Sequence, residues 1–185
     1  MKKERQMGLL KKRVLAISGE INAELVSDLN IAIIELNDKS KTVPIIISIT
    51  TPGGDIDCGL GIYDTLKVSQ APIYTVAVGQ VMSMGVPIFC AGAKRYSLEH
   101  TYFLIHPSTL SVIDSTTADL EDNVKYMKEQ NVILDKIIAD NSKLSLTKID
   151  QFNKHQTFFS AKFALEYGIV NQPLLNKKEF WRLFK

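Results

Sequence analysis

Cysteine and long apolar stretches are both scarce in this chain of 185 residues. With only Cys58 and Cys90, the chain cannot build a disulfide framework or a Cys/His zinc ribbon, and it suits a reducing compartment. No stretch approaches the ~18 consecutive apolar residues that a membrane helix needs. No apolar signal-peptide core follows the basic N-terminus. We therefore expect a cytoplasmic protein with no membrane partner.

An excess of one charge sign is also lacking, because 22 Lys and Arg face 20 Asp and Glu. The basic residues gather at the two ends, in residues 1–13 and 176–185. Basic ends can bind nucleic acid, but residues 1–13 contain no aromatic side chain on which a base could stack. We interpret the ends as solvated tails and expect no nucleic-acid partner.

The sequence does contain an alternation of apolar runs and helical patterns. Apolar runs typical of buried strands occur at residues 14–17, 44–49 and 73–78, with shorter runs at 95–98 and 102–105. Between the first two runs, Asn22 is a candidate cap for a helix whose apolar stripe is Leu25, Leu29, Ile33 and Leu36. Strands that are apolar throughout and alternate with helices indicate a parallel sheet covered on both faces. The predicted fold class is therefore α/β, with right-handed crossovers.

A longer helical pattern runs from about Thr116 to Asn141. Thr116 and Asp119 have the spacing of a capping box. Its apolar stripe comprises Leu120, Val124, Met127, Leu134 and Ile138. A helix of this length either lies along the sheet or projects and packs against another subunit.

Two glycine turns, at residues 51–55 and 79–85, each end a strand and open a helix. Ligands of open α/β sheets bind at such strand ends, and the free amides of a helix N-terminus suit a developing oxyanion. Neither turn has the spacing of a phosphate-binding loop. Ser83 lies in the second turn, where a serine is most often a helix cap. His106, at the end of an apolar strand, is the histidine best placed to act as a base.

Taken together, these motifs resemble ClpP, the serine peptidase of the Clp ATP-dependent protease, and its phage-type relatives. The similarity extends from about Leu9 to Val170. It is carried by Leu9–Arg13, Ser18–Asn22, Thr51–Gly54, Gly61–Thr65, Ser83–Gly85, Ala91–Lys94, Ile105–Pro107 and Ser160–Gly168. The resemblance implies a ClpP/crotonase-type α/β spiral, with parallel sheets flanked by helices and a long protruding handle helix.

The same resemblance implies an organisation and a set of partners. One domain would fill residues 1–185, with a head (9–113 and 142–172), a handle (114–141) and tails (1–8 and 173–185). The chain would form heptameric rings stacked into a 14-mer and would cleave unfolded protein or peptide substrates. The further partner would be a Clp ATPase or a second ClpP. ATP would be used only by that unfoldase, so we expect no metal and no organic cofactor in this chain.

Site residues follow from the resemblance position by position. Ser83 would be the nucleophile and His106 the general base. The backbone amides of Gly54 and Met84 would form the oxyanion hole. An extended peptide would add as a strand beside the segment Gly54-Asp55-Ile56.

The third catalytic position departs from the family. Aligned without a gap, the family's Asp is Gln156 here. An amide can orient the imidazole but carries no charge to stabilise the imidazolium, and an Asp-to-Asn change in the chymotrypsin-type triad costs ~10⁴ in rate. Asp140 and Asp150 are near in sequence and are alternative acids. Three hypotheses stay open: an active serine peptidase, a silent structural subunit that co-assembles with an active ClpP, and a crotonase-like acyl-CoA enzyme.

Overall fold

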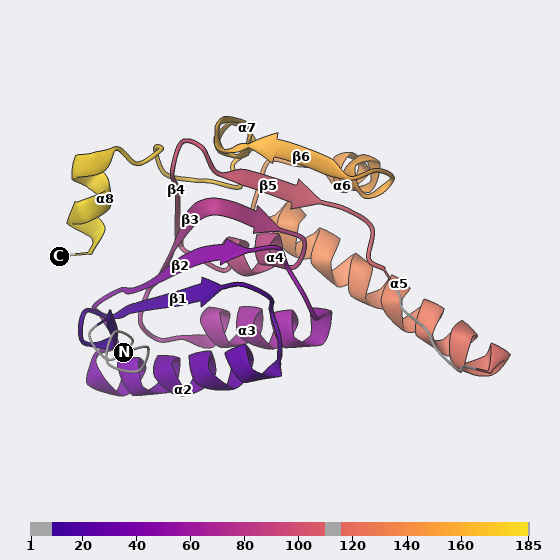
Figure 1. Ribbon diagram of the computed structural model, residues 1–185, viewed down its shortest axis with the longest axis horizontal. Helices are drawn as coiled ribbons and strands as arrows, with labels where there is room; N and C mark the ends of the chain where they lie inside the picture. The colour runs from indigo at the N-terminus through magenta and orange to yellow at the C-terminus, as the bar shows by residue number, and fades with distance from the viewer. Residues whose placement is uncertain (1–8, 110–115, 185) are drawn as a thin grey trace.

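A computed structural model of the chain describes residues 9–109 and 116–184. The expected N-terminal tail (1–8) and the junction of head and handle (110–115) lie outside the described residues. Strands and helices alternate through the first part of the chain, as predicted (Figure 1). These elements are β1 (Val14–Ser18), α2 (Ala23–Lys39), β2 (Ile45–Thr51), α3 (Ile56–Val68), β3 (Ile73–Met82), α4 (Gly85–Cys90), β4 (Lys94–Ser97) and β5 (Tyr102–Ile105).

The strands form one sheet in the order β1-β2-β3-β5-β6, with β4 paired to β3 beside this path. Strands β1 to β5 pair in parallel. The last strand, β6 (Thr157–Ser160), is antiparallel to β5. It lies between α6 (Leu146–Asn153) and α7 (Ala161–Glu166). The sequence patterns did not predict α6 or β6, because β6 buries only Phe159 and α6 only Ile149 and Phe152, too few apolar positions to set a period.

The main core lies between the sheet and helices α2, α3 and α4. Helix α2 starts after Asn22, whose side chain accepts a hydrogen bond from the Leu25 amide at 3.0 Å. The helix buries Leu29, Ile33 and Leu36. The predicted cap and stripe are thus confirmed. Strand β2 is almost continuously buried, as expected for a parallel strand covered by helices, whereas β1, at the edge of the sheet, buries only Val14 and Ile17.

The C-terminal segment covers part of the other face of the sheet. It contains α8 (Lys177–Leu183), within the region expected to be a tail. Phe180 and Leu183 pack against a small second core that includes Val14 and Val76. Helix α8 therefore docks on the body, at the opposite end of the molecule from the tip of α5 (Figure 1).

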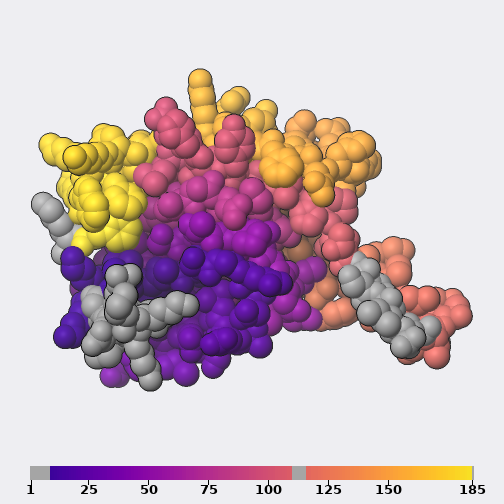
Figure 2. Space-filling view, viewed as in Figure 1, coloured from indigo at the N-terminus to yellow at the C-terminus, as the bar shows by residue number. Residues whose placement is uncertain are grey.

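Helix α5 (Thr117–Asp140) begins with the predicted capping box of Thr116 and Asp119. Only its second half contributes buried residues, and its first half extends away from the body (Figure 2). Leu120 and Val124 are 40% and 38% exposed, although their stripe could have packed on the sheet. Of the two arrangements considered, the helix therefore projects. Among the helices of the described ranges, none is long and apolar enough to cross a membrane.

Candidate active site

Ser83 lies in a tight turn between β3 and α4. Its backbone is left-handed, with φ 53°, a conformation that is uncommon for any residue except glycine and that often marks a functional site. Helix α4 is capped by Met84 without a side-chain hydrogen bond. Ser83 is therefore not the N-cap that commonly explains a serine at this place. Its amide donates to the carbonyl of Leu104 at 2.9 Å, which ties the turn to β5.

Glycines allow the two strand-end turns to approach each other. A Cβ on Gly53 would lie 2.6 Å from the Ser83 Cβ, and one on Gly85 would lie 2.5 Å from the Thr51 Cγ2. A Cβ on Gly54 would overlap the carbonyl oxygen of Ile21. Because real Cβ atoms do not approach this closely, these positions exclude any side chain. The turns predicted from the glycine pattern are thus in direct contact.

Two backbone amides lie beside Ser83. Among the described residues, the amides of Gly54 and Met84 have no protein acceptor, and both residues line the same pocket as Ser83. Met84 is buried, and a buried amide normally has a partner, whereas Gly54 is exposed. Both amides are available to a ligand. A side chain on Gly59 of α3 would overlap that of Met84, so the glycine makes room for it.

Asp55 and Ile56 continue from Gly54 into helix α3. The Asp55 Oδ1 accepts a hydrogen bond from the Cys58 amide at 2.8 Å, which caps the helix. This hydrogen bond lowers the pKa of Asp55. Ile56 lines the pocket, whereas Asp55 does not. The aspartate thus starts the helix, and the isoleucine contributes apolar surface.

The pocket itself brings Ser83 and His106 together. They come from the carboxyl ends of the neighbouring parallel strands β3 and β5, whose last pair is Met82 with Leu104. The cavity measures about 100 Å³, the volume of about three water molecules at ~30 Å³ each. This space holds one side chain of moderate size next to the serine.

The far side of the pocket is polar and was not predicted from the sequence. Asn131 and Asp135 reach it from α5, and Asn153 from the end of α6. The Asp135 Oδ1 accepts a hydrogen bond from the Asn153 Nδ2 at 2.8 Å. Burial raises the pKa of Asp135. One sequence signal was available, because Asp135 stands next to Leu134 in the apolar stripe and three positions before Ile138.

Gln156 has an exposed side chain and does not line the pocket. The β5–β6 ladder ends with Ile105 paired to Thr157. His106 and Gln156 are therefore each one residue beyond the last pair, on facing strands. The structure places Gln156 near the strand position of His106 but outside the cavity.

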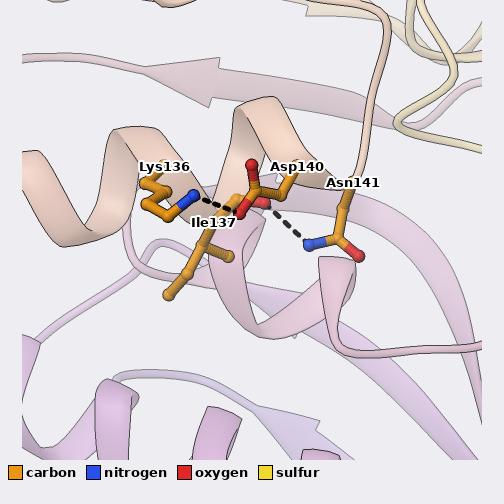
Figure 3. A network of polar contacts seen from close by, with 4 residues as sticks. All are labelled: Lys136, Ile137, Asp140 and Asn141. Carbon is orange, nitrogen blue, oxygen red and sulfur yellow. Dashed lines mark hydrogen bonds and ion pairs between the residues drawn. The ribbon is translucent and has the colours of Figure 1, made fainter.

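The two alternative acids are elsewhere. Asp140 pairs with Lys136 at 2.8 Å on the exposed side of α5, next to the Asn141 amide that donates to the Ile137 carbonyl (Figure 3). Asp150 pairs with Lys154 at 2.9 Å and is similarly exposed. Neither aspartate lines the pocket. Within the ranges that the structure describes, no three His, Cys, Asp or Glu residues are arranged to hold a metal ion.

The fold and pocket define a class of α/β protein in which strand ends bring a serine, a histidine and free amides together, an arrangement suited to acyl transfer. The family model for Clp protease matches residues 2–176. The ATP-dependent Clp protease proteolytic subunit 2 of Treponema denticola is 31% identical over 172 residues, covering 92% of this chain and 86% of the relative. Its namesake from Treponema pallidum is 31% identical over 171 residues, covering 91% and 85%.

A solved structure agrees with these relatives. A mutant of ClpP1 from Listeria monocytogenes superposes with a TM-score of 0.83 at 28% identity, covering 95% of this chain and 98% of that chain. This chain belongs to the Clp protease family. The predicted resemblance and the ClpP-type α/β fold are thereby confirmed.

Proposed function

We propose that this chain is a Clp-type serine peptidase that hydrolyses peptide bonds. The observation that carries the proposal is the shared pocket of Ser83, His106 and the free amides of Gly54 and Met84. These are the nucleophile, the base and the oxyanion donors that peptide hydrolysis requires. Membership of the Clp protease family supports the same activity.

The reaction has two halves. The Ser83 Oγ attacks the substrate carbonyl while His106 takes the hydroxyl proton, and the amides of Gly54 and Met84 donate to the oxyanion that forms. One such donor is typically worth ~2.7–4 kcal/mol. His106 then gives its proton to the leaving amine. Water cleaves the Ser83 ester by the same route in reverse, which regenerates the free hydroxyl.

The exposed edge at Gly54 supports binding of an extended peptide. The Ile21 amide donates to the carbonyl of Gly53 at 2.9 Å, and the Ile21 carbonyl accepts from the amide of Asp55 at 3.0 Å. This pairing does not use the Gly54 amide, which can donate to the oxyanion while the neighbouring backbone aligns an extended substrate. The backbone along residues 54–56 would align the substrate. The scissile carbonyl would then lie over Ser83.

An oligomeric ring is the assembly that we propose. The protruding α5 exposes apolar side chains that a lone subunit would leave in water, namely Leu120, Val124, Tyr126, Val132 and Ile133. The Treponema relatives are named as subunits of an ATP-dependent protease. We propose that this chain forms heptameric rings that pair into a 14-mer. Its partner would be a Clp ATPase or a second ClpP, and its location the cytoplasm. Only the partner unfoldase would use ATP, and the peptidase would need no metal or organic cofactor.

A silent structural subunit is the second candidate, favoured by one observation. The expected third position holds Gln156, an amide and not a carboxylate. Its side chain is also exposed and outside the pocket. Among the described residues, Ser83 and His106 also share no direct hydrogen bond, although such bonds are often loose before substrate binds. On this hypothesis the ring would assemble and not cleave.

A fluorophosphonate distinguishes the two candidates. We expect the intact mass of the assembled protein to show one adduct, on Ser83. In Ser83→Ala, both the adduct and peptide hydrolysis should be lost. Ser18→Ala is the matched control, because Ser18 is exposed at the end of β1 and away from the pocket. An assembled ring that forms no adduct and cleaves no peptide would establish the silent subunit instead.

A further inference from the structure

We propose that the pocket beside Ser83 selects substrates with a lysine side chain at the cleaved bond, and that Asp135 is the specificity-determining residue. The inference rests on the proposed peptidase function and adds a substrate class to it. It arises from a carboxylate that the catalytic machinery does not use. That carboxylate lines the same cavity as Ser83 and His106.

Geometry places Asp135 where a substrate side chain must go. When Ser83 attacks a carbonyl carbon, the side chain of the same substrate residue occupies the space next to the serine. The cavity of about 100 Å³ is that space, and Asp135 forms part of its far side. A group at the end of the substrate side chain would therefore meet this carboxylate.

The carboxylate charge has no cationic partner in the cavity. Asp135 is the only Asp, Glu, Lys or Arg among the described residues that line it. Its Oδ1 accepts from Asn153, and no donor to its Oδ2 occurs within the described ranges. The nearby Lys136 and Lys154 are bound in exposed pairs with Asp140 and Asp150. A half-buried charge of this kind is stabilised when a ligand brings the opposite charge.

The rest of the lining fits a long aliphatic stem. Ile105, Leu134 and Ile138 supply apolar surface in the same cavity, on which the methylene groups of a lysine would pack. The ammonium would then reach the free Asp135 oxygen. A single free carboxylate oxygen in a small cavity suits the compact ammonium of lysine better than the planar fork of arginine. A glutamate side chain would be repelled.

A matched set of fluorogenic peptides tests the preference for lysine. The peptides are identical except for lysine, norleucine or glutamate at the cleaved bond, and norleucine matches the stem of lysine without its charge. We expect kcat/KM for lysine to exceed that for norleucine by about tenfold, since a charged hydrogen bond is worth ~1.5–3 kcal/mol and partial exposure reduces it. In Asp135→Asn the ratio should fall to near one.

Asp140→Asn is the matched control. It removes the same charge from the same helix, outside the cavity, and we expect it to keep the lysine preference. Circular dichroism and gel filtration are used to check that Asp135→Asn folds and assembles like the parent. Cleavage that depends on Ser83 but shows no lysine preference, or a preference that survives Asp135→Asn, would overturn the inference and leave the proposed function intact.

Binding measurements keep the inference testable if no peptide is cleaved. Assembled Ser83→Ala protein is titrated by calorimetry with the lysine and norleucine peptides. We expect the lysine peptide to bind about tenfold more tightly in this variant and equally in the double variant with Asp135→Asn. Equal affinity for both peptides in Ser83→Ala would refute the role of Asp135, whether or not the ring is active.

Discussion

The pocket has two walls that are built on different physical principles. The glycine wall, formed by Gly54, Ser83 and Met84, is made of closely packed backbone, and Cβ atoms added to Gly54 or to the adjoining Gly53 and Gly85 would collide with their neighbours. The polar wall, formed by Asn131, Asp135 and Asn153, is made of side chains, and a hydrogen bond joins Asn153 to Asp135. On the glycine wall, close backbone packing fixes the shape of the pocket. On the polar wall, the shape depends on side chains that substitution can change.

This difference separates two parts of the proposed function. Amides held by tightly packed backbone are preorganised for an oxyanion, and preorganised donors contribute most to catalysis. Side chains on a helix can be replaced without moving the backbone. We infer that the glycine wall determines whether the chain can cleave, and the polar wall determines what it cleaves.

Gly54→Ala attacks the glycine wall and should have the largest effect. Gly54 has φ 150°, and its added Cβ would overlap the Ile21 carbonyl oxygen, so the amide would move. Loss of one oxyanion donor lowers kcat by ~10²–10³, and we expect a loss of this size in peptide hydrolysis.

Gly61→Ala is the control for that variant. Gly61 lies inside α3, where a Cβ would meet only the Val26 side chain at 3.8 Å. Alanine in a helix is favoured over glycine by ~1 kcal/mol, so this variant should be active and slightly more stable. Full activity in Gly54→Ala would remove Gly54 from the oxyanion hole.

Gln156→Asp lies outside both walls and tests whether His106 lacks a carboxylate partner. Gln156 faces His106 from the adjacent strand end, so a carboxylate there would stabilise the imidazolium. We expect kcat to rise by about tenfold or more, part of the ~10⁴ that a triad acid supplies. Gln151→Asp, on the exposed face of α6, should leave kcat unchanged. An unaltered rate in Gln156→Asp would mean that another group orients His106.

Asp135→Asn in the polar wall should have the smallest of these effects, a change in melting temperature that depends on pH. Burial raises the pKa of Asp135 above the ordinary 3.8, so the native state disfavours the charged carboxyl and loses stability as pH rises through the shifted pKa. The asparagine variant should therefore melt higher at pH 7, by less than about 2 °C because the group is half exposed.

The pH dependence of this difference is the check. The gain in melting temperature should disappear below the ordinary carboxyl pKa, where Asp135 is neutral in both folded and unfolded chains. A variant that melts lower than the parent at pH 7 would show that the hydrogen bond from Asn153 outweighs the cost of burial. The polar wall would then be structural as well as selective.

Strongly patterned segments were predictable from the sequence, and weakly patterned ones were not. The apolar run at 102–105 matches β5, and Asn22 and Thr116 cap their helices as predicted. Strand β6 is as short as β5, but it went unpredicted because it buries only Phe159. The course of α5 was undecided, because an apolar stripe looks the same whether its own sheet or a neighbour covers it.

The sequence by itself determined which residues can carry the chemistry, because glycine turns, caps and strand ends are encoded by local patterns around Ser83 and His106. Only the tertiary structure decided what surrounds them. Asp135 lies far along the chain from Ser83, and α5, which packs against α4 and α6, brings it into the same cavity. Gln156, which stands at the expected position in the sequence, does not line the cavity. Local backbone preference acts over a few residues, whereas the lining of a pocket depends on how distant elements pack.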